Sequence, residues 1–211
     1  MLCTCCTRTL ALAACLLAPT LTHGRPRLAK EQMEQLAQEK VIEFSQKVKG
    51  SNVKMGKAIA VIDDVPEAVL YVLLGLDKYK HFIPRVSESR ITKQRGWDTY
   101  AVINTDLPWP VKDCWAYVKL TRNDKPGRVY EAKWHMINGT MKEYRGSALI
   151  EPWTRDGKRS VLTYRLLFEP KGAAPDSMIS NGVRAVASTI VKRIRLRVKA
   201  LRKFKKMPRG L

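Results

Sequence analysis

Six strand-like runs separated by short turns occupy the middle of the chain, and their spacing limits the fold more than any other feature. They lie between Arg85 and Glu169 and cover residues 85–94, 97–106, 113–123, 128–137, 143–151 and 159–169. Turn signals such as Arg95-Gly96 and Asn138-Gly139 separate them. Because so few residues join consecutive runs, the strands must pair antiparallel as a meander.

A long amphipathic helix is predicted over residues 176–206, after the last strand. At about 100° per residue, its apolar side chains fall on one side and its basic side chains on the other. The apolar side carries Val183, Val186, Ala187, Ile190, Ile194, Val198 and Leu201. Two more strands (41–48 and 53–62) and a helix (66–75) precede the meander. The sequence therefore predicts an α+β fold in which a curved antiparallel sheet wraps around the terminal helix.

Alternation along the strands indicates which side chains face that helix, because successive residues of a strand point to opposite faces. The predicted inner face is apolar and contains several small residues. These are Cys114, Ala116, Ala132, Gly146 and Ala148. Opposite one long helix, they leave either a closely packed helix or an empty volume of the size that small-molecule sites have. The pattern leaves both alternatives open.

Residues 1–24 have the pattern of a signal peptide, with one early charge, a short apolar run and small residues before Arg25. We therefore expect an exported, periplasmic protein. A competing lipobox-like stretch ends at Cys15 and would instead give a lipoprotein. Removal of residues 1–24 leaves Cys114 as the only cysteine, so we expect a buried small side chain there and no internal disulfide.

Four segments, in this order, resemble bacterial members of the START lipid-transfer domain superfamily. They are Val61–Val69, Leu76–Pro84, the proline-rich bend Thr105–Asp113 (TDLPWPVKD), and Ile150–Asp176. The resemblance covers residues 40–201 and implies a helix-grip fold with an internal apolar tunnel for a lipid or sterol. Residues 25–39 are then an N-terminal helical extension, and residues 202–211 are a basic C-terminal tail.

One departure from the family pattern concerns the residue after the bend. The family commonly has Asp-Arg there, with the Arg side chain in the tunnel, whereas Asp113 is followed here by Cys114. A buried Arg needs a paired carboxylate. Its absence implies a less polar tunnel that lacks the usual anchor for the polar head of a ligand.

We expect a monomeric carrier that binds, and transfers or stores, a hydrophobic molecule without catalysis. Strand alternation and helix periodicity give the expected lining as Ala116, Val118, Trp134, Met136, Tyr144, Ala148, Tyr164, Leu166, Phe168, Val183, Ala187 and Ile190. The sequence contains no metal-spaced cluster, phosphate loop or nucleophile motif, so we expect no metal and no cofactor. Some superfamily relatives cyclise polyketides, which leaves a cyclase or aromatase using the same tunnel as the alternative.

The chain carries 39 Lys and Arg against 19 Asp and Glu, a net charge of +20, and ten of the cations lie between residues 192 and 209. Such a charge favours an anionic partner. The basic helix face is either solvated surface or a site for docking to an anionic membrane. The docking residues would be Lys192, Arg195, Lys199, Arg202, Lys203 and Lys206. Nucleic acid is a weaker candidate, because only Phe204 supplies an aromatic ring for base stacking.

Overall fold

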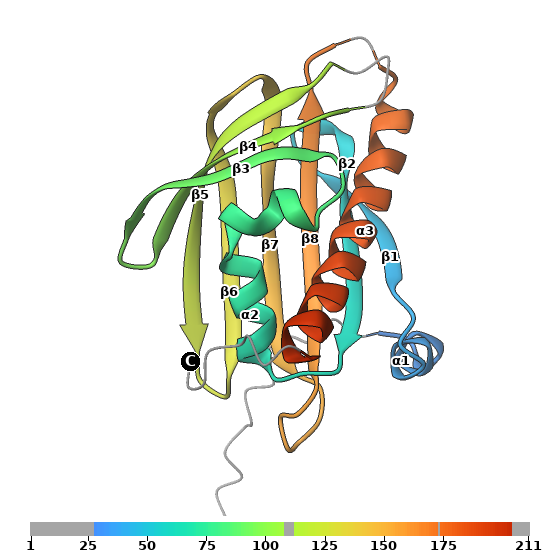
Figure 1. The fold of residues 1–211 in the computed structure, drawn as a ribbon. Coiled ribbons are helices and arrows are strands. Elements are labelled where there is room, and N and C mark those ends of the chain that lie inside the picture. The colour runs from blue at the N-terminus through green and yellow to red at the C-terminus, as the bar shows by residue number, and fades with distance from the viewer. Residues whose placement is uncertain (1–27, 108–111, 173, 204–211) are drawn as a thin grey trace, which may run out of the picture.

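The computed structural model describes residues 28–107, 112–172 and 174–203, which form one curved sheet around a long helix (Figure 1). The predicted signal peptide and Lys206 lie outside the described residues. The sheet is antiparallel throughout, with the strand order β1-β2-β8-β7-β6-β5-β4-β3. The predicted α+β class and helix-grip architecture are confirmed.

The elements lie close to the predicted ranges. The strands are β1 (Ile42–Val48), β2 (Ser51–Ile62), β3 (Val86–Arg95), β4 (Asp98–Thr105), β5 (Cys114–Lys125), β6 (Val129–Gly139), β7 (Met141–Pro152) and β8 (Ser160–Pro170). The helices are α1 (Lys30–Ala37), α2 (Pro66–Leu74), the short 3-10 helix η1 (Leu76–His81) and α3 (Asp176–Lys203). Strands β3 to β8 pair in chain order, and β2 returns to pair with β8. This pairing places the hairpin formed by β1 and β2 beneath α3.

Helix α2 begins where the sequence signals predict. Pro66 occupies a first-turn position, where its missing N–H costs nothing, and Glu67 lies at the positive end of the helix dipole. The helix ends before Gly75, and η1 follows at once. No helix was predicted at η1. Together α2 and η1 form the segment that closes the concave side of the sheet beside α3 (Figure 1).

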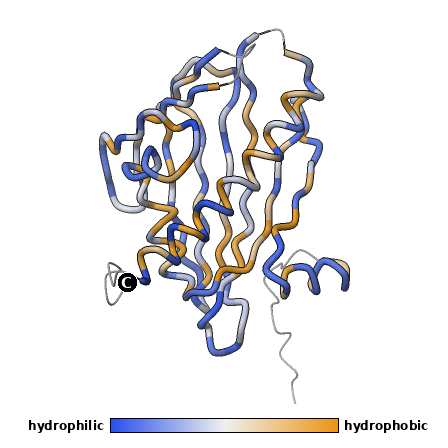
Figure 2. The backbone as a smooth tube through the Cα atoms, turned by 45° about the vertical axis from the view of Figure 1, so that its right-hand side comes forward, coloured by the Kyte–Doolittle hydropathy of each residue, from blue (hydrophilic) through white to orange (hydrophobic). Residues whose placement is uncertain are grey.

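The apolar side of α3 lies on the concave face of the sheet, as predicted. Ala187, Ile194 and Val198 are at most 1% exposed. Val186 is the exception among the predicted apolar positions, because it lies at the edge of the buried stripe and is 43% exposed. Figure 2 shows hydrophobic and hydrophilic segments alternating along α3 and along the strands. No helix among the described residues is both long and apolar enough to span a membrane.

Helix α1 packs on the opposite, convex face of the sheet. Its Leu36 is fully buried against Ile42 of β1, Ile59 and Val61 of β2, and Val161 of β8. The N-terminal extension therefore packs onto the sheet. The helix covers only the end of the sheet at β1, β2 and β8.

The predicted turn at Asn138-Gly139 is wrong. Strand β6 stops pairing with β7 after His135, which lies opposite Arg145, and continues along β5 until Gly139 lies opposite Ala116. Gly139 is needed there because a Cβ atom would collide with the carbonyl oxygen of Trp115. The close approach of a neighbouring strand, rather than a turn conformation, requires this glycine.

Candidate functional site

A buried cavity lies between the concave face of the sheet and the α2–η1 segment. Its lining comes from α2, η1 and five strands, and consists of Leu73, Leu76, Tyr79, Ile103, Val118, Leu120, Trp134, Tyr144 and Tyr164. Its volume is about 20 Å³. Such a space holds about one water molecule, whereas small-molecule sites typically occupy about 300–1,000 Å³. The predicted tunnel is thus not present as an open volume in this structure.

The twelve predicted lining residues all belong to, or pack against, one hydrophobic cluster. Four of them line the cavity: Val118, Trp134, Tyr144 and Tyr164. The other eight fill the space between the sheet and α3, and they are Ala116, Met136, Ala148, Leu166, Phe168, Val183, Ala187 and Ile190. The strand alternation therefore identified the correct face of the sheet but not the position of the free space along it.

Five cavity residues were not predicted as lining. Leu120 and Ile103 extend the inner faces of β5 and β4, and alternation could have included them. Leu73, Leu76 and Tyr79 come from α2 and η1. In α2 no local pattern shows which side chains point inward, because six of its nine residues are buried and all six are apolar. In η1 the buried residues Leu76 and Tyr79 are three positions apart, which matches the 3-10 period and could have indicated them.

Small residues on the inner face allow close packing rather than open space. At Gly146 a Cβ atom would overlap the indole ring of Trp134, so the glycine provides room for that ring. The Trp134 ring in turn lies 5.1 Å from the Tyr164 ring, centroid to centroid. At Gly56 the backbone of α3 itself occupies the place of a side chain, since a Cβ would lie 2.6 Å from the carbonyl oxygen of Val183. Of the two alternatives left open by the sequence, close packing describes this structure.

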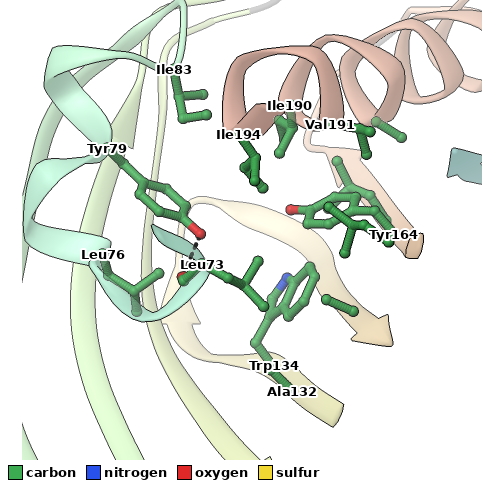
Figure 3. Packing of buried hydrophobic residues seen from close by; sticks show 14 of the residues in the cluster. Leu73, Leu76, Tyr79, Ile83, Ala132, Trp134, Tyr164, Ile190, Val191 and Ile194 are labelled. Carbon is green, nitrogen blue, oxygen red and sulfur yellow. Dashed lines mark hydrogen bonds between the residues drawn. The ribbon is translucent and has the colours of Figure 1, made fainter. Parts of the chain in front are cut away.

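The polar groups at the cavity are hydrogen-bond donors without charge. The Tyr79 hydroxyl donates to the carbonyl oxygen of Leu73 at 2.7 Å. Burial raises the pKa of Tyr144 to about 12 and raises the pKa of Tyr164 well above its ordinary value, so both phenols stay protonated at neutral pH. The Trp134 Nε1 atom is buried and has no acceptor among the described residues (Figure 3). The cavity lining, as far as the structure describes it, contains no ionised side chain.

A second, larger space lies on the outer side of α2 and η1. This groove has a volume of about 400 Å³ and is bounded by α2, η1, β3, β5 and the last turns of α3. Leu70, Leu74 and Phe82 give it apolar walls, while Arg122 and Arg197 contribute cations. The Arg197 guanidinium lies over the Phe82 ring, 5.8 Å from its centroid. Thus α2 and η1 separate a small buried cavity from an open groove.

Comparison with known proteins identifies the architecture. No family model and no curated protein sequence matches the chain. Among solved structures, the STAR-related lipid transfer protein of Xanthomonas axonopodis aligns with a TM-score of 0.66 and 15% identity, covering 75% of this chain and 93% of that chain. Human STARD10 aligns with a TM-score of 0.66 and 17% identity, covering 79% of this chain and 72% of that chain. Human StAR-related lipid transfer protein 5 aligns with a TM-score of 0.64 and 8% identity, covering 82% of this chain and 93% of that chain. This chain has a START-type helix-grip fold.

In this chain the residue after the proline-rich bend carries no positive charge. Cys114 lies on the inner face of β5 and is 6% exposed. Burial raises the pKa of its thiol, so the side chain is an uncharged, poorly nucleophilic group. The two histidines in the described residues, His81 and His135, are exposed, and no group of three potential metal ligands occurs within those residues.

Two arginines of the predicted docking set hold α3 against neighbouring loops. Arg195 is half-buried and donates to the carbonyl oxygen of Glu39 at 2.8 Å. Arg202 donates to the carbonyl oxygen of Asp63 at 3.0 Å. Each guanidinium group therefore makes a hydrogen bond within the domain, although Arg202 remains exposed.

The lysines of the predicted docking set extend into solvent. Lys192, Lys199 and Lys203 are exposed. Lys192 makes one long ion pair, with 3.9 Å between its Nζ and the Glu43 carboxylate. Such exposed pairs are weak. An external partner can thus reach the charges of these three lysines.

An ion pair fixes the start of α2 to the β5–β6 hairpin. The Glu67 carboxylate accepts hydrogen bonds from the Arg128 guanidinium and, at 2.8 Å, from the Tyr130 hydroxyl. Hydrogen bonds from Arg128 lower the pKa of Glu67 to about 2. Burial, followed by the bond to Glu67, raises the pKa of Tyr130 to about 12. This contact anchors one end of the α2–η1 segment.

Glu67→Gln is expected to destabilise the protein by roughly 1–3 kcal/mol at pH 7, because it removes a charged acceptor from two donors. The folded pKa of Glu67 lies below its ordinary value of 4.5. Its stabilising effect is therefore complete above pH 4.5 and declines as the pH falls toward 2. Urea unfolding at several pH values should show the two proteins converging in acid. Glu34→Gln, at an exposed position on α1, should change stability by less than about 0.5 kcal/mol at every pH.

Proposed function

We propose that this START-type domain binds a hydrophobic small molecule or lipid on the concave face of its sheet, beneath the α2–η1 segment, and carries it without chemical change. The observation that supports this proposal is the position of α2 and η1 between the buried cavity and the groove of about 400 Å³. Outward movement of this thin segment would join the two into one space of ligand size. The lipid-transfer proteins of the same fold add support.

Catalysis is the weaker candidate. Acid–base chemistry requires a group whose pKa lies near the working pH. Burial moves the pKa values of the cavity tyrosines, Tyr144 and Tyr164, upward and away from neutrality. A cyclase that used them as acids would need a change in this environment on substrate binding. We therefore favour binding without reaction.

Organic extraction of the purified protein followed by mass spectrometry tests the proposal. We expect one dominant apolar molecule in roughly stoichiometric amount, and a protein stripped of it should take up added lipid. An empty protein that takes up no apolar probe would contradict the proposal. A protein that converts an added polyketide would instead establish the enzymatic alternative.

We propose further that the exposed lysines on α3 dock the domain to an anionic membrane. Each cation near such a surface contributes about 1 kcal/mol. Replacing Lys192, Lys199 and Lys203 together by Gln should therefore lower partitioning onto vesicles of phosphatidylserine and phosphatidylcholine by about 100-fold at low salt.

The matched control for docking removes three lysines elsewhere. Lys30, Lys80 and Lys158 are also exposed, and their replacement by Gln lowers the net charge equally. If the two triple variants lose the same amount of binding in vesicle flotation, overall charge and not the α3 face is responsible. Binding to neutral vesicles that does not depend on salt would exclude electrostatic docking.

A further inference from the structure

A buried donor without an acceptor lies at the centre of the core. Trp134 is 7% exposed, and its Nε1 atom has no hydrogen-bond partner among the described residues. A buried N–H group left unpaired costs about 1–3 kcal/mol. Most buried polar groups in proteins have a partner. The unpaired indole therefore points to an acceptor that is supplied from outside the chain.

The indole faces the cavity from β6. In Figure 3 its nitrogen and the Tyr164 hydroxyl are directed into the space between η1 and α3, where Tyr79 and Ile194 form the opposite side. The Tyr79 hydroxyl is already used, since it donates to Leu73. The Trp134 N–H thus remains available at a cavity that has the size of one polar group, about 20 Å³.

The chemistry of the lining limits what can bind there. An indole N–H donates one hydrogen bond and cannot accept one. The described lining contains no ionised side chain to pair with a charged ligand, and burial of an unpaired carboxylate or ammonium group is very costly. A neutral acceptor oxygen, as in a ketone, an ester or an alcohol, meets both conditions.

We propose that Trp134 donates its indole N–H to a neutral acceptor oxygen of the ligand and so selects uncharged, oxygen-bearing hydrophobic molecules over hydrocarbons and fatty acids. This inference rests on the proposed binding function. The cavity receives the oxygen, and the apolar remainder of the molecule occupies the space opened by movement of α2 and η1.

Three probes of equal chain length test the selectivity: hexadecane, methyl tetradecyl ketone and palmitic acid. Equilibrium binding at pH 7 should give an affinity for the ketone about tenfold above that for either of the others. Trp134→Phe should abolish the difference in affinity between the ketone and hexadecane, whatever the smaller ring does to the binding of both. Trp97→Phe, which replaces a ring that is 58% exposed, should alter none of the three.

The two proposals fail in different ways. If none of the probes binds, the proposed binding function is wrong. If all bind but palmitic acid binds as tightly as the ketone, or Trp134→Phe retains the preference for the ketone over hexadecane, the role of Trp134 is wrong and a trapped water satisfies its N–H.

A measurement on the unmutated protein covers the case in which Trp134→Phe does not fold. The chain has five tryptophans, and ¹⁵N labelling of their indoles gives resolvable N–H signals. One buried indole proton should shift downfield on addition of methyl tetradecyl ketone and should not shift with hexadecane. An unchanged set of indole signals while the ketone binds would overturn the inference.

Discussion

Gly56→Ala is expected to destabilise the protein by roughly 1–3 kcal/mol, the usual cost of forcing an extra carbon into a packed core. The added Cβ would lie 2.6 Å from the Val183 carbonyl oxygen and 2.8 Å from the Cα atom of Arg184. Both atoms belong to the backbone of α3, so no side chain can rotate out of the way. Relief requires the whole helix to move off β2.

The measurement is thermal and urea unfolding of the purified variant. For a domain of this size, each kcal/mol lowers Tm by about 2–4 °C. Gly182→Ala is the matched control, because Gly182 lies exposed in α3 and an added Cβ there would have no neighbouring atom within 4 Å. That change should stabilise the helix by up to about 1 kcal/mol. Equal stability of Gly56→Ala and the parent protein would show that α3 does not press on β2.

Gly56 also illustrates what the sequence could not supply. Its role depends on Val183, a residue of a different element far along the chain. The same limit applies to Asn138-Gly139, a pair typical of a hairpin turn, which instead continues β6 because Gly139 passes close to Trp115. In both cases a glycine is required by a backbone from elsewhere in the fold, and local sequence carries no sign of that neighbour.

Strand alternation was more informative, because the distinction between inside and outside is a local property of a pleated chain. It placed Trp134 and Tyr164 correctly on the concave face, and both are buried. It could not show that Gly146 makes room for the Trp134 ring, nor that α2 and η1 close the cavity with Leu73 and Tyr79. Free volume depends on how all these side chains fit together, so it follows from the three-dimensional structure alone.

Val118→Phe is expected to lower uptake of a hydrophobic ligand at least tenfold. Val118 is 1% exposed on β5 and lines the cavity of about 20 Å³. A phenyl ring is larger than this cavity, so it would fill the space and press on the surrounding side chains, at a cost of about 1–3 kcal/mol in stability. The same ring occupies the position into which a ligand must enter. Uptake should be measured as the amount of methyl tetradecyl ketone retained by protein stripped of lipid.

Val102→Phe is the matched control, since Val102 lies opposite Tyr117 on the convex face of the same sheet. It should retain full uptake. If Val118→Phe is too unstable to assay, Val118→Ile adds a single methylene group to the same cavity and should weaken uptake in the same direction. Unchanged uptake by a folded Val118→Phe variant would mean that the ligand does not enter the buried cavity beneath α2 and η1. Binding would then be confined to the outer groove, where Leu70 and Leu74 supply the apolar wall.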